Sequence, residues 1–194
     1  WVSMFNGQDL PGWKSNEETP GAFSVEDGVI KVSNGRAHLF YTGVDGAAKF
    51  KNVDFKAKVK TAGTEQGSNS GIYVHTEFEP AGWPTKGYEC QVNSTKHKDP
   101  KKTGGLYAVK DVLNTSPVAD DVWFDYSIKV ENKHITIAIN GQVTSDWTEP
   151  ADWDPAKALK NMPGRKFGEG TVALQGHDPK SLVFYKDLFI KALP

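Results

Sequence analysis

The chain has 194 residues, 38% of them hydrophobic and 24% charged, which is typical of one globular domain and predicts a single domain over residues 1–194. Its 23 Lys and Arg nearly balance 24 Asp and Glu, and only Arg36 and Arg165 are arginines, so nucleic acid is an unfavourable partner. One cysteine, Cys90, excludes an intrachain disulfide and a multi-cysteine zinc framework. No apolar run approaches the roughly 18–20 residues of a membrane-spanning helix. Because the chain opens at Trp1 and not at methionine, we expect a leader that is absent from it.

Alternation of apolar and polar residues dominates the chain, whereas the spacing of an amphipathic helix is almost absent. Val53, Phe55, Ala57 and Val59 alternate with charged residues, as in a strand with one buried face. By the same criteria and by turn residues, we expect strands at 22–26, 29–33, 37–42, 53–60, 71–77, 88–93, 105–109, 171–176 and 182–192.

The second half of the chain contains the clearest hairpin signals. A three-strand meander is expected over 123–147, with its second turn at Asn140-Gly141. Asp154 and Pro155 predict a helix of at most two turns. The lysine-rich segment 96–102 is expected to be an exposed loop. Ten or more short strands require two packed sheets, so the predicted fold is an all-β, two-sheet antiparallel sandwich.

Three predicted strands carry polar groups on the side that alternation assigns away from the core. Lysine is missing from these faces, although it is common on solvated strands. Sugar hydroxyls both donate and accept hydrogen bonds, and a mixed set of carboxylates, amides, imidazoles and phenols satisfies them in both senses, so we expect a carbohydrate site there. The face residues are Tyr73, His75 and Glu77, then Glu89, Gln91 and Asn93, then Gln175 and His177. The remaining histidines, His38, His97 and His134, are expected to be ordinary surface or hydrogen-bonded residues.

Common catalytic signatures are absent from the sequence. It contains no P-loop, no dinucleotide-binding glycine motif, no nucleophile elbow and no His-Glu-x-x-His. Cys90 falls on the predicted core side of its strand, which disfavours a thiol nucleophile. The series Glu89, Gln91, Asn93 supplies one carboxylate where a retaining glycosidase on such a sandwich needs two.

Several stretches resemble, in order, the 3-keto-disaccharide hydrolase family. The most specific is the opening Phe5-Asn6-Gly7-Gln8-Asp9-Leu10-Pro11-Gly12-Trp13. It is followed by Ser70-Gly71-Ile72-Tyr73, Gly87-Tyr88-Glu89-Cys90-Gln91-Val92, Thr103-Gly104-Gly105-Leu106-Tyr107 and Ala173-Leu174-Gln175-Gly176-His177. The family's usual aromatic-Arg-Asn before the last strand reads Tyr185-Lys186-Asp187 here. The resemblance covers nearly the whole chain.

The resemblance implies a jelly-roll sandwich of the concanavalin A-like lectin/glucanase type and a secreted or periplasmic bacterial location. It also implies action on glycosides whose glucosyl unit is oxidised at C3. A C3 ketone acidifies the C2 proton, so a base can remove it, the C1 substituent leaves, and water adds to the enone. A divalent cation or a fixed hydrogen-bond donor would stabilise the enolate oxygen.

Site residues follow from this chemistry and from the polar faces. Glu89 and His177 are expected to be acid/base or metal-contacting groups. Tyr73, His75, Glu77, Gln91, Gln175 and Tyr107 are expected to bind the substrate. The alternative is a carbohydrate-binding domain without catalysis, for which the same face with Trp83 and Tyr107 would serve. The sequence assigns neither a metal ligand set nor an oligomeric state.

Overall fold

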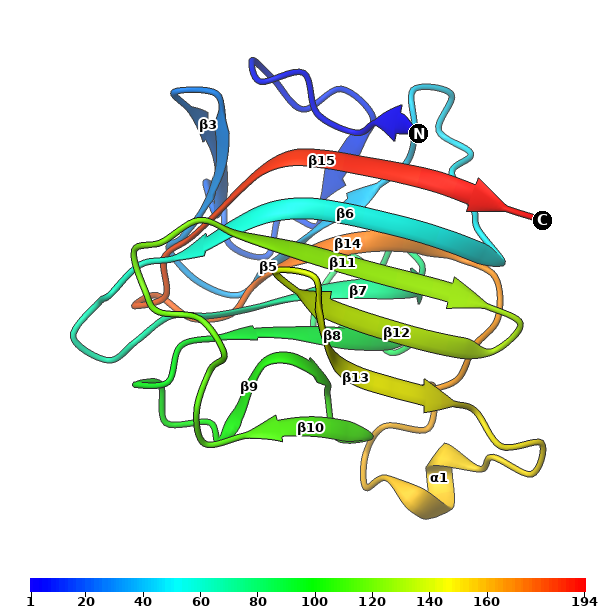
Figure 1. Cartoon of the computed structure of the whole chain (residues 1–194). Coiled ribbons are helices and arrows are strands. Elements are labelled where there is room, and N and C mark those ends of the chain that lie inside the picture. The colour runs from blue at the N-terminus through cyan, green and yellow to red at the C-terminus, as the bar shows by residue number, and fades with distance from the viewer.

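The computed structural model describes residues 1–194 and consists of two antiparallel sheets stacked face to face (Figure 1). The eight-stranded sheet has the order β13-β12-β11-β6-β15-β4-β3, with β1 paired to β15. Its strands are β1 (Val2–Ser3), β3 (Phe23–Glu26), β4 (Val29–Val32), β6 (Asn52–Thr61), β11 (Phe124–Glu131), β12 (His134–Ile139), β13 (Gln142–Thr148) and β15 (Val183–Leu193). These observations confirm the predicted two-sheet sandwich.

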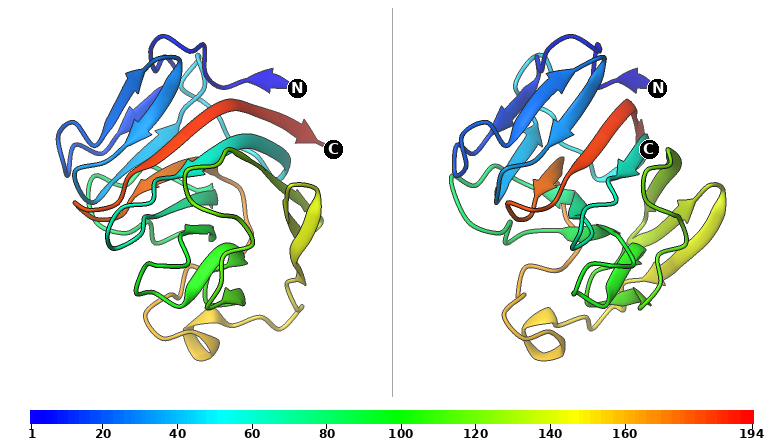
Figure 2. Two further views of the ribbon diagram at one scale, coloured as in Figure 1. Left: turned by 60° about the vertical axis from the view of Figure 1, so that its left-hand side comes forward. Right: turned by 90° about the vertical axis from the view of Figure 1, so that its left-hand side faces the viewer.

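The seven-stranded sheet forms the second layer and has the order β10-β9-β8-β7-β14-β5-β2. Its strands are β2 (Trp13–Ser15), β5 (Ala37–Tyr41), β7 (Asn69–Thr76), β8 (Tyr88–Asn93), β9 (Lys101–Leu106), β10 (Lys110–Leu113) and β14 (Thr171–Gly176). The two views of Figure 2 show both layers and the long connection from β13 to β14 that passes below them. That connection contains α1 (Pro155–Ala158), and the structure has no helix long and apolar enough to cross a membrane.

A core cluster of 30 buried residues fills the space between the sheets. Alternation supplies it from both layers: Phe55 and Ile128 come from the eight-stranded sheet, and Ile72, Cys90 and Leu174 come from the seven-stranded one. Burial raises the pKa of the Cys90 thiol, which keeps it protonated. The prediction that Cys90 faces the core is therefore confirmed.

The hairpins follow the turn chemistry of the sequence. Asn140 and Gly141 both have positive φ, of 49° and 76°, as a two-residue turn between β12 and β13 requires. Asp27 and Gly28 have the same conformation between β3 and β4, with φ of 49° and 76°. The predicted meander over 123–147 is confirmed as β11, β12 and β13.

Two local predictions were wrong around the lysine-rich segment. The strand expected at 105–109 is β9, which ends at Leu106, and the unpredicted β10 follows it. Lys102 lies within β9 and is buried, and its ammonium donates to the carbonyl oxygens of Ser94 at 2.8 Å and His97 at 2.7 Å. Those carbonyls replace the water that a lysine normally requires, so this part of the segment is not an exposed loop.

Candidate functional site

A cavity of about 450 Å³ lies on the face of the seven-stranded sheet that points away from the core. Six of the predicted site residues line it, namely Tyr73, Glu89, Gln91, Tyr107, Gln175 and His177. They come from neighbouring strands because Tyr73 pairs with Glu89 and with Ala173 in the sheet register. Alternation places the odd-numbered residues of β7, β8 and β14 on this one face.

Glu89 is the centre of a hydrogen-bonded group at the cavity floor. Its Oε2 accepts from the Tyr73 hydroxyl at 2.9 Å and from Arg165 Nη2 at 3.2 Å. Its Oε1 accepts from Gln175 Nε2 at 2.9 Å. The carboxylate is only 5% exposed, so these donors supply the solvation that water gives elsewhere.

Arg165 is the positive partner of Glu89 and is 6% exposed. Burial opposes the charged form, but contacts with Tyr73 and Glu89 outweigh it and raise the pKa of Arg165. Burial, followed by the charge of Glu89, raises the pKa of the Tyr73 hydroxyl well above its usual range. At neutral pH the cavity floor therefore holds a charged guanidinium and a protonated phenol.

Aromatic side chains form the walls of the cavity. Trp83 is 43% exposed, and its ring centroid lies 5.2 Å from that of His177 and 5.8 Å from that of His38. Tyr107 donates to Asp99 Oδ2 at 3.2 Å, and burial raises the pKa of its hydroxyl. Flat apolar faces beside polar groups suit a sugar ring, whose CH faces and hydroxyls differ in the same way.

Two of the predicted site residues lie outside this cavity. His75 has a positive φ of 58°, and the pairing of β7 with β14 shifts register between Thr171 and Ala173, next to it. The alternation of side chains that places Tyr73 in the cavity is therefore interrupted before His75. Its ring packs against Phe167 with centroids 5.4 Å apart and lines a separate hollow. Glu77 follows the end of β7, is exposed, and forms an ion pair with Lys86.

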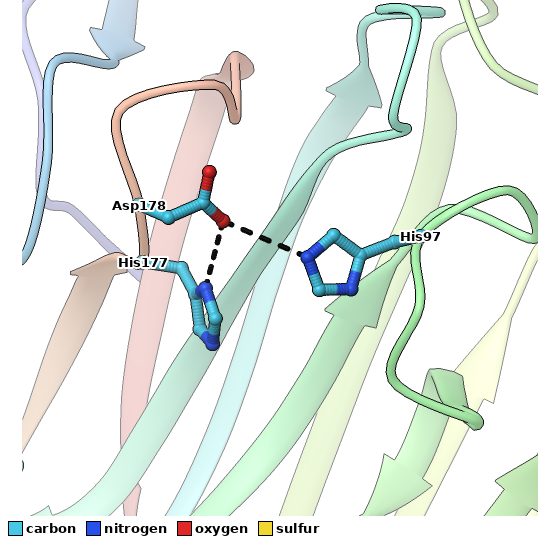
Figure 3. A group of neighbouring side chains, drawn as sticks. All are labelled: His97, His177 and Asp178. Atoms are coloured by element: carbon cyan, nitrogen blue, oxygen red, sulfur yellow. Dashed lines mark hydrogen bonds and ion pairs between the residues drawn. The ribbon is translucent and has the colours of Figure 1, made fainter.

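His177 is part of a second group at the rim of the cavity (Figure 3). Its Nδ1 lies 2.8 Å from Asp178 Oδ2, and His97 Nε2 lies 3.6 Å from the same oxygen. The three side chains could hold a metal ion, because their ligand atoms lie within 4.8 Å of one another. His97 is 9% exposed and belongs to this group. The expectation that it is an ordinary surface or hydrogen-bonded residue did not include this position.

Arg165 and His97 are among the residues at the candidate site that the sequence analysis did not assign to it. Arg165 is one of two arginines in a chain whose other cations are lysines, and that rarity was the available signal. It is carried by the loop after α1, where no periodicity fixes a side-chain direction. His97 follows β8 in a turn, and only the tertiary structure brings it to His177.

Comparisons with known proteins show proteins of the same fold and a matching family. A structure described as a "putative glycosyl hydrolase" from Parabacteroides distasonis superposes with a TM-score of 0.81 at 23% identity, covering 98% of this chain and 93% of that one. A second from the same organism gives 0.75 at 19% identity, with 100% and 99% covered. The carbohydrate-binding module CBM66 from Bacillus subtilis gives 0.61 at 11% identity, with 93% and 96% covered.

At these identities the structural likenesses show the fold, a jelly-roll sandwich also used by carbohydrate-binding modules and glycosyl hydrolases. No curated protein is significantly similar in sequence. The sequence model of one protein family, the 3-keto-alpha-glucoside-1,2-lyase-like domain, matches residues 1–191, which is nearly the whole chain. This is the 3-keto-disaccharide hydrolase family that the sequence resembles, so that resemblance is confirmed. The chain therefore belongs to the 3-keto-alpha-glucoside-1,2-lyase-like domain family.

Proposed function

We propose that this protein is a carbohydrate-active enzyme that cleaves glycosides whose glucosyl unit carries a ketone at C3. The observation that carries the proposal is the carboxylate of Glu89, held beside the charged Arg165 in a sugar-sized cavity. The family match and the carbohydrate-related structural neighbours support the substrate class.

The reaction is an elimination followed by hydration. A base takes the C2 proton, and the C2–H electrons enter an enolate that extends to the C3 oxygen. When the enolate reforms the ketone, the C1–O bond breaks, and the aglycone leaves as an alcohol after it takes up a proton. Water then adds across the C1–C2 double bond, giving the free 3-keto sugar. No oxidant or reductant is needed.

Glu89 is the base in this scheme. A carboxylate offers about four acceptor positions, and Tyr73, Arg165 and Gln175 occupy three of those on Glu89. One position remains, on Oε1, which receives only the Gln175 amide. The three donors fix the carboxylate in one orientation, so its free position is directed before substrate arrives.

Arg165 stabilises the enolate that forms beside Glu89. A guanidinium has five N–H donors, and the structure uses two in hydrogen bonds, to Glu89 at 3.2 Å and to the Gly87 carbonyl oxygen at 3.5 Å. The charge is retained within a largely buried floor, where it attracts a developing oxyanion more strongly than in water. One base and one electrophile are therefore adjacent.

The proposal is tested by incubating the protein in D2O with a 3-keto-glucoside and, separately, with its unoxidised parent. The product and its deuterium content are then measured. We expect the glycosidic bond to be cleaved in the 3-keto-glucoside and not in its parent, with deuterium appearing at C2 of the oxidised sugar. Glu89→Gln should lower kcat by about 10²–10⁴-fold, because it removes the base. Glu77→Gln is the matched control, since that carboxylate is exposed and lies outside the cavity. Robust cleavage of the parent sugar without C2 exchange would contradict the mechanism.

A carbohydrate-binding domain without catalysis is the second candidate. The likeness to the module CBM66 favours it, and so does the aromatic wall formed by Trp83 and Tyr107. Saturable binding of the 3-keto-glucoside with no product over many hours would support this candidate and exclude the enzyme.

A further inference from the structure

Two loops bring His97, His177 and Asp178 together at one end of the sugar cavity. His97 follows β8, whereas His177 and Asp178 follow β14, so segments 80 residues apart in sequence meet here (Figure 3). Both imidazoles approach one carboxylate oxygen, Asp178 Oδ2, at 2.8 Å from His177 Nδ1 and 3.6 Å from His97 Nε2. The longer distance exceeds a normal hydrogen bond, so His97 Nε2 lies near Asp178 Oδ2 without a hydrogen bond to it.

We propose that His97, His177 and Asp178 bind one divalent transition-metal ion, with Zn²⁺ as the preferred ion. Two imidazoles and one carboxylate form a common three-residue ligand set for Zn²⁺, which leaves a fourth position open. The candidate ligand atoms already lie within 4.8 Å of one another, so small side-chain movements would bring all three around one ion.

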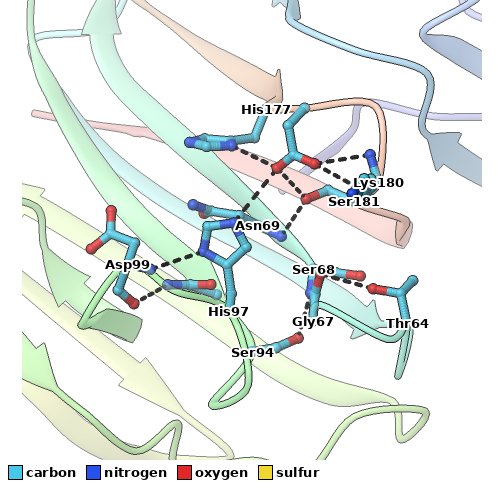
Figure 4. A network of polar contacts seen from close by, with 12 residues as sticks. Thr64, Gly67, Ser68, Asn69, Ser94, His97, Asp99, His177, Lys180 and Ser181 are labelled. Carbon is cyan, nitrogen blue, oxygen red and sulfur yellow. Dashed lines mark hydrogen bonds and ion pairs between the residues drawn. The ribbon is translucent and has the colours of Figure 1, made fainter.

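The carboxylate is prepared for this role by its neighbours. Ser181 Oγ donates to Asp178 Oδ2 at 2.7 Å, and the backbone N–H groups of Lys180 and Ser181 donate to Oδ1 at 2.9 and 3.0 Å (Figure 4). These three donors hold the Asp178 carboxylate in one orientation before an ion arrives.

Asn69 provides a second, independent observation. In the view of Figure 4 its side chain is seen between those of His97 and His177; it is 1% exposed and has no hydrogen-bond partner for either amide atom. Buried amides are normally hydrogen-bonded, so the two amide atoms of Asn69 are available to a ligand at this place. An ion at this place, or a water bound to it, would supply that partner.

The surroundings of the cluster also select among ions. Lys96, Lys98 and Lys180 line the hollow beside it, and their charges oppose any divalent cation, so binding depends on the bonds that the ligand atoms form with the ion. Imidazole nitrogen suits Zn²⁺ better than it suits the hard cations Ca²⁺ and Mg²⁺.

Metal binding also requires a change of tautomer at His97. Its Nδ1 accepts a hydrogen bond from Asp99 N–H at 3.2 Å, so the ring proton of the neutral side chain is on Nε2. When Nε2 binds an ion, this proton moves to Nδ1 and the hydrogen bond from Asp99 is lost.

The place of the ion also indicates what it would contact. His177 lines both the sugar cavity and the hollow beside the lysines, so the open metal position would lie near the cavity rim. The vicinal ketone and hydroxyl oxygens of an oxidised sugar form a chelating pair for such an ion. This sugar contact rests on the proposed function, whereas metal binding itself does not.

Calorimetry and native mass spectrometry on chelator-treated protein, with Zn²⁺ and no sugar, test the site. We expect one Zn²⁺ per chain, a higher Tm with Zn²⁺, and much weaker binding of Mg²⁺. His177→Ala and Asp178→Asn should each weaken Zn²⁺ binding by at least about 100-fold, because each removes a ligand. Because no sugar is present, failure of the 3-keto-glucoside assay does not affect the result.

His134→Ala is the matched control, because His134 and Asp146 form an exposed pair at 3.0 Å that has no third ligand. This variant should keep wild-type affinity for Zn²⁺. Circular dichroism shows whether each variant is folded, and His97→Gln supplies an additional ligand substitution if one of the others does not fold. The absence of stoichiometric binding to the wild type, or unchanged affinity in folded ligand variants, would overturn the proposal.

Discussion

Glu89 shows how one buried carboxylate can organise several neighbours. Tyr73, Arg165 and Gln175 all donate to it, and Gln175 Nε2 also donates to the Tyr73 hydroxyl at 3.1 Å. Each group therefore limits the rotation of the others. Networks of this kind are stable when complete and become costly when one partner is removed, because a buried charge is left unpaired.

The pairing of Arg165 with Glu89 leads to a prediction about stability. Arg165→Met should lower the free energy of unfolding by about 3–5 kcal/mol, because the Glu89 carboxylate stays buried without its positive partner. The double variant with Glu89→Gln should recover part of that loss, because the unpaired charge is removed as well. Urea unfolding of the two single variants and the double variant measures the coupling, and strictly additive losses would show that the two residues are independent.

His38 leads to a prediction about pH. It is fully buried with no partner for either ring nitrogen, and burial lowers its pKa from 6.5 to about 3. Between these values the unfolded chain binds a proton that the folded protein does not, so stability should fall as pH decreases from 6.5 towards 3. His38→Phe should flatten this part of the profile, measured by urea unfolding at each pH. A variant without the exposed His134 is the control. If the free energy of unfolding of His38→Phe depends on pH as steeply as that of the wild type, His38 is not the group responsible.

At the scale of elements, the loop after α1 decides whether the cavity is complete. Gly164 accepts from the Gly87 N–H at 3.0 Å, and Trp153 Nε1 donates to the Arg165 carbonyl oxygen at 2.7 Å. A Cβ atom at Gly164 would lie 1.8 Å from the Thr85 carbonyl oxygen. The backbones of the two loops that flank the cavity therefore approach closely at Gly164, and glycine is required for that approach.

Gly164→Ala should displace the loop that carries Arg165 and so lower activity on the 3-keto-glucoside at least tenfold. Gly168→Ala in the same loop should have little effect, because a Cβ there meets no atom within 4 Å. Steady-state kinetics and amide hydrogen exchange of residues 160–168 compare the two variants. Equal activity in both would show that the contact between the loops does not position Arg165.

At the scale of the whole molecule, the two sheets share one core and hence one source of stability. Strands of both sheets supply most of the 30 residues of the core cluster, so neither sheet can bury its apolar face without the other. The cavity is built on the opposite face of the seven-stranded sheet, where polar side chains are also buried by the flanking loops.

This shared core predicts cooperative unfolding. Tryptophan fluorescence and far-UV circular dichroism should report the same urea midpoint, and limited proteolysis should not release a stable half. Two separated transitions would show that the sheets, or the loops that carry Trp83 and Trp153, unfold independently. The circular dichroism spectrum of the native protein should be dominated by strand, because α1 has four residues.

The sequence by itself determined the sandwich and much of the cavity floor. In β11–β13 and in β8, apolar residues at every second position fix which face is buried, and this rule placed Glu89, Gln91 and Cys90 correctly. The same rule could not place His75, because a positive φ there interrupts the alternation. It also could not place Arg165 or His97, since both lie in loops whose positions depend on contacts with distant segments. Only the tertiary structure decided that Arg165 meets Glu89 and that His97 meets His177 and Asp178, because a loop side chain has no periodic constraint on its direction.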